Sequence, residues 1–192
     1  MNFQRSGGFY PVNTPFPWQG DSQMATVHEN LLDWLRDAHA MEQQAESMLT
    51  SMSDRIENYP QLKVRIDQHI EETRWQKTQI ESCINRLGSS PSAFKDMAAR
   101  IVAFGQGLGG VAMSDEVVKG AMGSYIFENM EIASYRIIIA AAEMAGDAET
   151  KRIAQEILMQ EQAMADWLLN HLPELTTQFL SRSETPDVAA KR

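Results

Sequence analysis

Apolar residues recur at alternating spacings of four and three along four stretches of the chain, which is the pattern of one face of an amphipathic helix. The stretches cover about residues 26–54, 61–87, 115–145 and 147–172. Glycine is absent from residues 21–87, and the seven prolines lie at the margins of these stretches or outside them. Because proline and glycine interrupt helices, this punctuation predicts four long helices and leaves little room for strands.

The ends of the four stretches carry helix-capping residues. Thr26 followed by Glu29 matches a capping box, in which both side chains bond free amides of the first helical turn. Gly88 and Gly146 follow the second and third stretches, where a glycine commonly caps a helix. The last helix is expected to end before Pro173.

A shorter helix is expected after Ser90-Pro91, and it would end in the glycine-rich residues 105–110. No strand precedes these glycines and no Lys-Ser/Thr pair follows them, so they do not indicate a phosphate loop. The sequence thus predicts an all-α fold, an up-down four-helix bundle with an additional short connecting helix. The bundle would span residues 26–180, after an extended arm (1–25) that is disordered or packs on a partner and before a flexible tail (181–192).

Each of the four apolar stripes turns polar near its middle. The stripes run from Leu31 to Met52, from Leu62 to Leu87, from Val117 to Ala142 and from Ala154 to Leu168. Their central ionisable residues are Glu42 in the first, His69 with the adjoining Glu72 in the second, Glu128 and Glu131 in the third, and Glu161 in the fourth. The midpoints of antiparallel helices lie at about one level, so these acids are expected to converge in the core.

Several carboxylates in one core need neutralising partners, because an isolated buried charge costs several kcal/mol. A shared dinuclear metal site would satisfy all of them. Two alternatives stay open: the acids lie at the stripe edges and reach solvent, or they form a salt-bridge layer with Arg74, Lys77 or Arg136. A stripe shifted by one residue in the third helix would place Arg136 inside.

Composition narrows the partners of this 192-residue chain. Its 17 basic and 26 acidic residues give a net charge of -9, which offers no general attraction to nucleic acid. No apolar run is long enough to span a membrane, and no signal-peptide pattern opens the chain. The single cysteine, Cys83, fits a reducing compartment, so we expect a cytoplasmic protein without a membrane partner.

Specific stretches of the sequence resemble a known family. They comprise residues 33–42, His69 with Glu72-Thr73 and Gln76, Phe127-Glu128, Glu131-Ile132-Ala133, and residues 164–168. From Leu32 onward the chain resembles the YciE/YciF family of bacterial ferritin-like proteins, and it is most similar to the YciE type. The resemblance implies a ferritin-like bundle, related to rubrerythrins and manganese catalases, with a connection to stress responses.

The superfamily's ligand plan is one Glu from each of two helices and Glu-x-x-His from each of the other two. By position, the single glutamates would be Glu42 and Glu128, and the paired glutamates Glu72 and Glu161. The residues three positions after the paired glutamates, however, are Trp75 and Met164, so both usual histidines are missing.

Other residues near the centre could replace the missing histidines. His69 could supply one nitrogen and Glu131 an extra oxygen, which would give an oxygen-rich site that prefers Fe or Mn. For His69, a hydrogen-bonded core histidine is the alternative. We expect Thr73, Gln76, Tyr125 and Tyr135 to be hydrogen-bond partners near the acids.

Two functions follow from this pattern. The first is a stress-response protein with two Fe or Mn ions in its core, which handles peroxide as a peroxidase-, catalase- or ferroxidase-like oxidoreductase or sequesters the ion. No catalytic residue is identified, and the missing histidines weaken the case for turnover. The second is a non-catalytic helical homodimer with a degenerate metal site, a structural or interaction protein whose aromatic arm contacts a partner.

Overall fold

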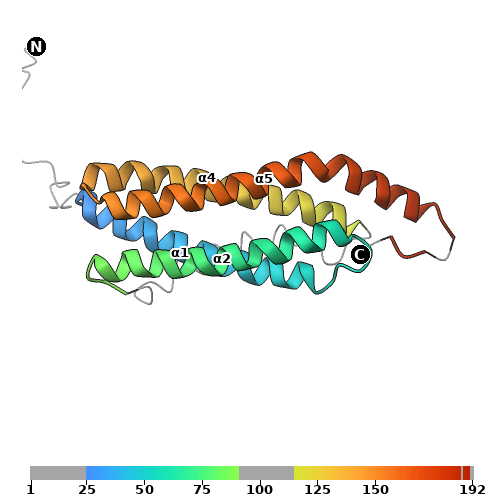
Figure 1. Ribbon diagram of the computed structural model, residues 1–192, viewed down its shortest axis with the longest axis horizontal. Helices are drawn as coiled ribbons and strands as arrows, with labels where there is room; N and C mark the ends of the chain where they lie inside the picture. The colour runs from blue at the N-terminus through green and yellow to red at the C-terminus, as the bar shows by residue number, and fades with distance from the viewer. Residues whose placement is uncertain (1–24, 91–114, 187, 191–192) are drawn as a thin grey trace, which may run out of the picture.

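The computed structural model describes residues 25–90, 115–186 and 188–190, and within them it contains four α-helices and no strand. The helices are α1 (Val27–Ser53), α2 (Pro60–Arg86), α4 (Glu116–Ala145) and α5 (Ala148–Ser183) (Figure 1). The predicted all-α four-helix bundle is confirmed. Among these four helices, none combines the length and the apolarity that crossing a membrane requires.

The helices form two hairpins that pack side by side. α1 contacts α2 and α4, and α5 contacts α4 and α2. In Figure 1, α1 and α5 run in one direction and α2 and α4 in the other, so every packed pair is antiparallel. The connection from α2 to α4 covers residues 87–115, and its described ends lie at opposite ends of the bundle. The expected connecting helix and the glycine-rich residues 105–110 lie outside the described residues.

Capping residues set the helix ends as predicted. The Thr26 amide donates to Glu29 Oε2 over 2.7 Å, and the Glu29 amide donates to Thr26 Oγ1 over 3.2 Å, which completes the capping box of α1. Gly88 and Gly146 have φ of 77° and 72°, a left-handed conformation that glycine adopts without a Cβ clash. Each glycine lies just beyond a long helix, so both expected helix ends are confirmed.

The predicted end of the last helix is wrong. α5 continues through Pro173 for a further ten residues to Ser183. A proline within a helix removes one backbone hydrogen bond, and neighbouring contacts can outweigh that loss. Here Leu175 is buried beyond the proline and Phe179 packs against the same apolar cluster, so packing extends the helix past its breaker.

The core consists of two apolar clusters with the polar centre between them. One cluster includes Leu49, Leu62 and Leu168, and the other includes Leu35, Ile80 and Ile157, all nearly or fully buried. Burying a side chain of this size stabilises the fold by about 1.5–3 kcal/mol. The two clusters therefore hold the helices in register and fix the level of the residues between them.

Candidate metal centre

Five of the six predicted site residues lie buried together at mid-bundle, and all four helices contribute. Their exposed fractions are 0% for Glu42, His69 and Glu161 and 1% for Glu128 and Glu131. The interpretation in which these acids reach solvent is therefore wrong. The sixth residue, Glu72, has 21% of its side chain exposed and lies at the margin of the cluster.

His69, Glu128 and Glu161 form the heart of the centre. Each offers one ligand atom, and these atoms lie within 4.8 Å of one another. His69 Nε2 is 3.0 Å from Glu128 Oε2 and 3.4 Å from Glu161 Oε2. One nitrogen and two carboxylate oxygens from three different helices thus face a common point.

Glu72 fixes the orientation of the His69 ring. His69 Nδ1 donates to Glu72 Oε2 over 2.7 Å, which turns Nε2 towards Glu128. Arg65 Nη1 donates to the same Glu72 oxygen over 3.1 Å, and Gln68 Nε2 donates to Glu72 Oε1 over 2.9 Å. A carboxylate in this position is the usual partner of a metal-binding histidine. Sequence reasoning missed Arg65, although its spacing of seven residues from Glu72 places both on one face of α2.

Two further side chains each occupy one oxygen of a central acid. Tyr135 donates from its hydroxyl to Glu42 Oε1. Gln76 Nε2 donates to Glu161 Oε1 and, over 3.0 Å, to Gln160 Oε1. The expected roles of Tyr135 and Gln76 are thus confirmed. The buried Thr73 hydroxyl has no such partner, and no hydrogen bond to the acids is seen for Tyr125 among the described contacts.

Several carboxyl oxygens of the centre remain without a partner. Glu42 Oε2, Glu131 Oε1 and Glu161 Oε2 are buried and accept no hydrogen bond, although Glu161 Oε2 lies 3.4 Å from His69 Nε2. A buried polar atom without a partner costs about 1–3 kcal/mol, so such atoms are rare unless they have a use. Oxygens of this kind around an oriented imidazole are the donors that hard divalent ions prefer.

Burial shifts the pKa of the central carboxyls upwards. Desolvation, reinforced by repulsion from Glu161, raises the pKa of Glu42 and of Glu131 well above the ordinary value of 4.5. Desolvation also raises the pKa of Glu128 to about 8, although the His69 imidazole opposes this shift. Without a cation the centre therefore retains protons at neutral pH.

The histidine and the marginal glutamate respond differently. Burial lowers the pKa of His69, but the surrounding carboxylates outweigh this effect and the pKa is raised well above 6.5. Burial also raises the pKa of Glu72, but hydrogen bonds and the charges of His69 and Arg65 lower it below 4.5 overall. Glu72 is therefore ionised under conditions in which the buried acids hold protons.

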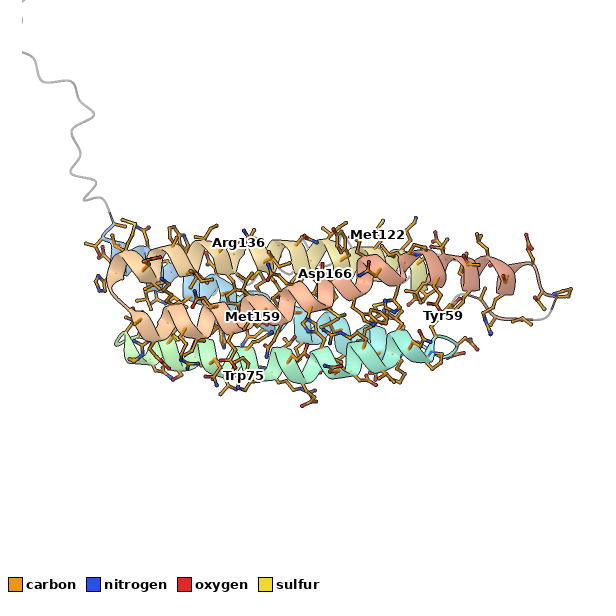
Figure 2. The ribbon with its side chains drawn as sticks, turned by 45° about the horizontal axis from the view of Figure 1, so that its top comes forward. Tyr59, Trp75, Met122, Arg136, Met159 and Asp166 are labelled. Carbon is orange, nitrogen blue, oxygen red and sulfur yellow. The ribbon has the colours of Figure 1, made fainter. Side chains whose placement is uncertain are left out.

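A structural salt-bridge layer is contradicted for the described residues. Arg74 Nε is 2.7 Å and Lys77 Nζ 2.6 Å from the oxygens of Glu46, which lies outside the centre. Arg136 is exposed on the outer side of α4, so the shifted stripe is also wrong (Figure 2). No described lysine or arginine pairs with Glu42, Glu128, Glu131 or Glu161; the nearest cationic group is His69 itself.

The positions three residues after Glu72 and Glu161 hold hydrophobic side chains. Met164 is fully buried in the core, and Trp75 is partly buried against the second apolar cluster. Asp166, the nearest acid to Met164 on α5 other than Glu161, is exposed (Figure 2). The centre thus offers one nitrogen and many oxygens, as the sequence predicts.

Comparisons with known proteins agree with this fold. Residues 26–181 match the family of the domain of unknown function DUF892. The chain is similar to a protein from Xanthomonas campestris pv. campestris, with 41% identity and a TM-score of 0.72 over 83% of this chain and 100% of that one. It is also similar to YcfI from Rhodopseudomonas palustris, with 27% identity and a TM-score of 0.64 over 77% and 96% of the two chains. The E. coli stress protein YciF has the same fold, with 19% identity and a TM-score of 0.72 over 81% and 99%.

Proposed function

Since this chain belongs to the DUF892 family, we propose a function for it from the geometry of its centre. The protein binds two divalent Fe or Mn ions in the bundle core. Buried, unpaired carboxyl oxygens around one oriented histidine carry this proposal. Two divalent ions would balance four ionised carboxylates, whereas among the described residues His69 alone offers a basic group at the centre, with at most one positive charge.

The proposed ligands are Glu42, His69, Glu128, Glu131 and Glu161, with Glu72 behind His69. Tyr135 and Gln76 hold one oxygen of Glu42 and Glu161, respectively, and leave the other oxygen of each for an ion. The family resemblance supports a ferritin-like centre of the YciE type, in which the oxygen-rich ligand set favours Fe and Mn over Cu and Zn.

The biological role we propose is a cytoplasmic stress protein that handles peroxide or sequesters the ion. A bound Fe or Mn pair would supply the change of oxidation state that the side chains lack. The side chains exclude bulk water, hold the imidazole by its Nδ1 proton and retain protons on Glu42, Glu128 and Glu131 until cations replace them.

A homodimer is the second part of the proposal. α4 carries large apolar side chains that solvent reaches: Met122 at 44%, Ile126 at 39%, Ile137 at 49% and Met144 at 76% exposure. Apolar residues on the outer side of a bundle helix are typical of an association surface. A metal-free protein that is stable as this dimer would instead favour the structural, non-catalytic function.

Elemental analysis tests the proposal. Protein purified from cells grown with Fe and Mn, or loaded with Mn(II) afterwards, is compared with a Glu42→Gln, Glu128→Gln double variant. We expect about two ions per chain in the wild type and a loss of both in the variant. Absence of bound metal in the wild type after anaerobic Fe(II) and Mn(II) loading would refute the proposal.

A further inference from the structure

A groove between α2 and α5 lies beside the centre, and Glu72 is the residue that the groove and the margin of the centre share. It is open to solvent and has a volume of about 760 Å³, and its lining includes Val64, Arg65, Gln68 and Glu72 of α2 and Ala163 and Trp167 of α5. The three polar α2 side chains among these are linked by hydrogen bonds that meet at the Glu72 carboxylate. The groove therefore has carboxylate oxygens at the point where it approaches the core.

Glu72 joins the groove to the buried residues. Its side chain is 21% exposed, whereas those of Glu128 and Glu161 are 2% and 0% exposed. Glu72 Oε2 is 2.7 Å from His69 Nδ1, and His69 Nε2 is 3.0 Å from Glu128 Oε2. A single imidazole thus separates a partly exposed carboxylate from the buried oxygens of the centre.

A second cavity, between α1 and α4, has a different lining. It encloses about 260 Å³ among Trp34, Met41, Met130 and Ile137, with Asp37 and Ser134 as its polar members. A hydrated cation that entered it would lose water ligands against mostly apolar side chains, which is costly. Compared with this apolar cavity, the α2–α5 groove suits a divalent ion better.

We propose that divalent metal ions reach the core through the α2–α5 groove and that Glu72 is the first carboxylate to bind them. This inference rests on the proposed metal centre. Arg65 lies 3.1 Å from the same Glu72 oxygen, so an incoming ion competes with the guanidinium for it. Glu72 thus admits ions and also positions His69.

The rate of loading tests this route. Metal-free protein is mixed with Mn(II), separated from free ion at timed intervals and analysed for bound Mn. Glu72→Gln removes the negative charge but keeps an oxygen that can accept the hydrogen bond from His69 Nδ1. Glu71→Gln, on the exposed side of α2, is its matched control. Ala163→Phe narrows the groove, and Ala148→Phe at the exposed N-terminal end of the same helix is its control.

Each variant has a defined expected outcome. Glu72→Gln and Ala163→Phe should load at least about tenfold more slowly than wild type, because a local charge and an open path each raise the association rate. Ala163→Phe should still reach the wild-type final number of ions per chain. Arg65→Gln should load faster, and both controls should load at the wild-type rate.

Contrary results separate the two proposals. Wild-type loading rates in both Glu72→Gln and Ala163→Phe would place the route elsewhere and overturn this inference, while the centre itself would stand. Slower loading in the two controls as well would also overturn it, because the effect would not be specific to the groove. A wild type that binds no Mn(II) at all would instead refute the metal centre, and the route with it.

Discussion

At the scale of single residues, the centre is a set of acids that folding buries at a cost. Glu42, Glu128 and Glu131 are held in a protein interior that raises the pKa of each. This arrangement does not stabilise the metal-free protein. In the proposed metal centre these acids are the ligands of the cations, and variants of these residues should separate stability from metal binding.

Glu131→Gln should stabilise the metal-free protein at about pH 8, by about 1–3 kcal/mol, because glutamine has a similar shape and needs no proton. At about pH 5 the gain should be small, since little free energy is then needed to keep Glu131 protonated. Urea unfolding in chelator-containing buffer measures the difference, with the exposed Glu71→Gln as control. A variant less stable than wild type at both values would contradict this account of Glu131.

The stability of the metal-free wild type should fall as pH rises. The folded pKa of Glu128, about 8, lies above its ordinary value of 4.5, so folding retains a proton that the unfolded chain releases. That contribution is complete below 4.5 and is lost as pH rises through about 8. The raised pKa of His69 also lowers the free energy of unfolding as the pH rises above 6.5. The lowered pKa of Glu72 changes the free energy of unfolding only below pH 4.5, where stability falls as the pH falls.

Urea unfolding of the metal-free protein at several pH values checks this sign. Each carboxyl that takes up a proton on folding contributes a slope of up to about 1.4 kcal/mol per pH unit. A free energy of unfolding that stays constant or rises between about pH 5 and about pH 8 would contradict the shifted pKa values. Saturating Mn(II) should remove the decline, because metal binding favours the deprotonated ligands.

The sequence predicts which residues lie near the centre but not all of their contacts. Periodicity places Glu72 near the stripe of α2 but does not give its rotamer, which points to His69 Nδ1 and Arg65. The sequence therefore predicted Glu72 as a metal ligand, and whether it binds a resident ion stays a prediction. The sequence did not predict the contact of Arg65 with Glu72, because a basic residue on a half-exposed helix face is common in any protein.

At the scale of helices, the sequence predicted most of what the structure contains. Every stripe position quoted as a central polar residue other than Glu72 is buried, because each lies at the 3.6-residue period of its helix. The predicted end of α5 is wrong because a local rule for proline does not account for the tertiary contacts of Leu175. The α2–α4 connection shows the same limit, since no local pattern specifies which end of the bundle the chain returns to.

The C-terminal end of α4 offers a direct test of this local logic. Gly146 has φ of 72°, its amide donates to Glu143 O over 3.2 Å, and the Asp147 amide donates to Ala142 O over 2.9 Å. A Cβ at Gly146 would meet no atom within 4 Å, so the only cost of alanine there is the strain of its left-handed backbone conformation. Gly146→Ala should therefore lower the free energy of unfolding by about 1 kcal/mol, and Gly146→Asn by less. If urea unfolding gave Gly146→Ala the same free energy of unfolding as wild type, this interpretation would be contradicted.

At the scale of the whole molecule, metal binding should stabilise the bundle, because all four helices contribute proposed ligands. A ligand at one hundred times its dissociation constant adds about 2.7 kcal/mol to the stability of the folded state. Thermal unfolding with and without Mn(II) should show a higher Tm for the loaded wild type. The Glu42→Gln, Glu128→Gln double variant should show no such shift, and an equal shift in both proteins would indicate that Mn(II) binds elsewhere.

The central claim is that two divalent ions lie between the four helices at mid-bundle. Anomalous diffraction at the Mn or Fe absorption edge, from crystals of loaded protein, tests it most directly because it locates each ion. The account predicts two peaks among Glu42, His69, Glu128, Glu131 and Glu161, close to the oxygens that now lack partners. Peaks confined to the surface, or a core without peaks in fully loaded crystals, would contradict it.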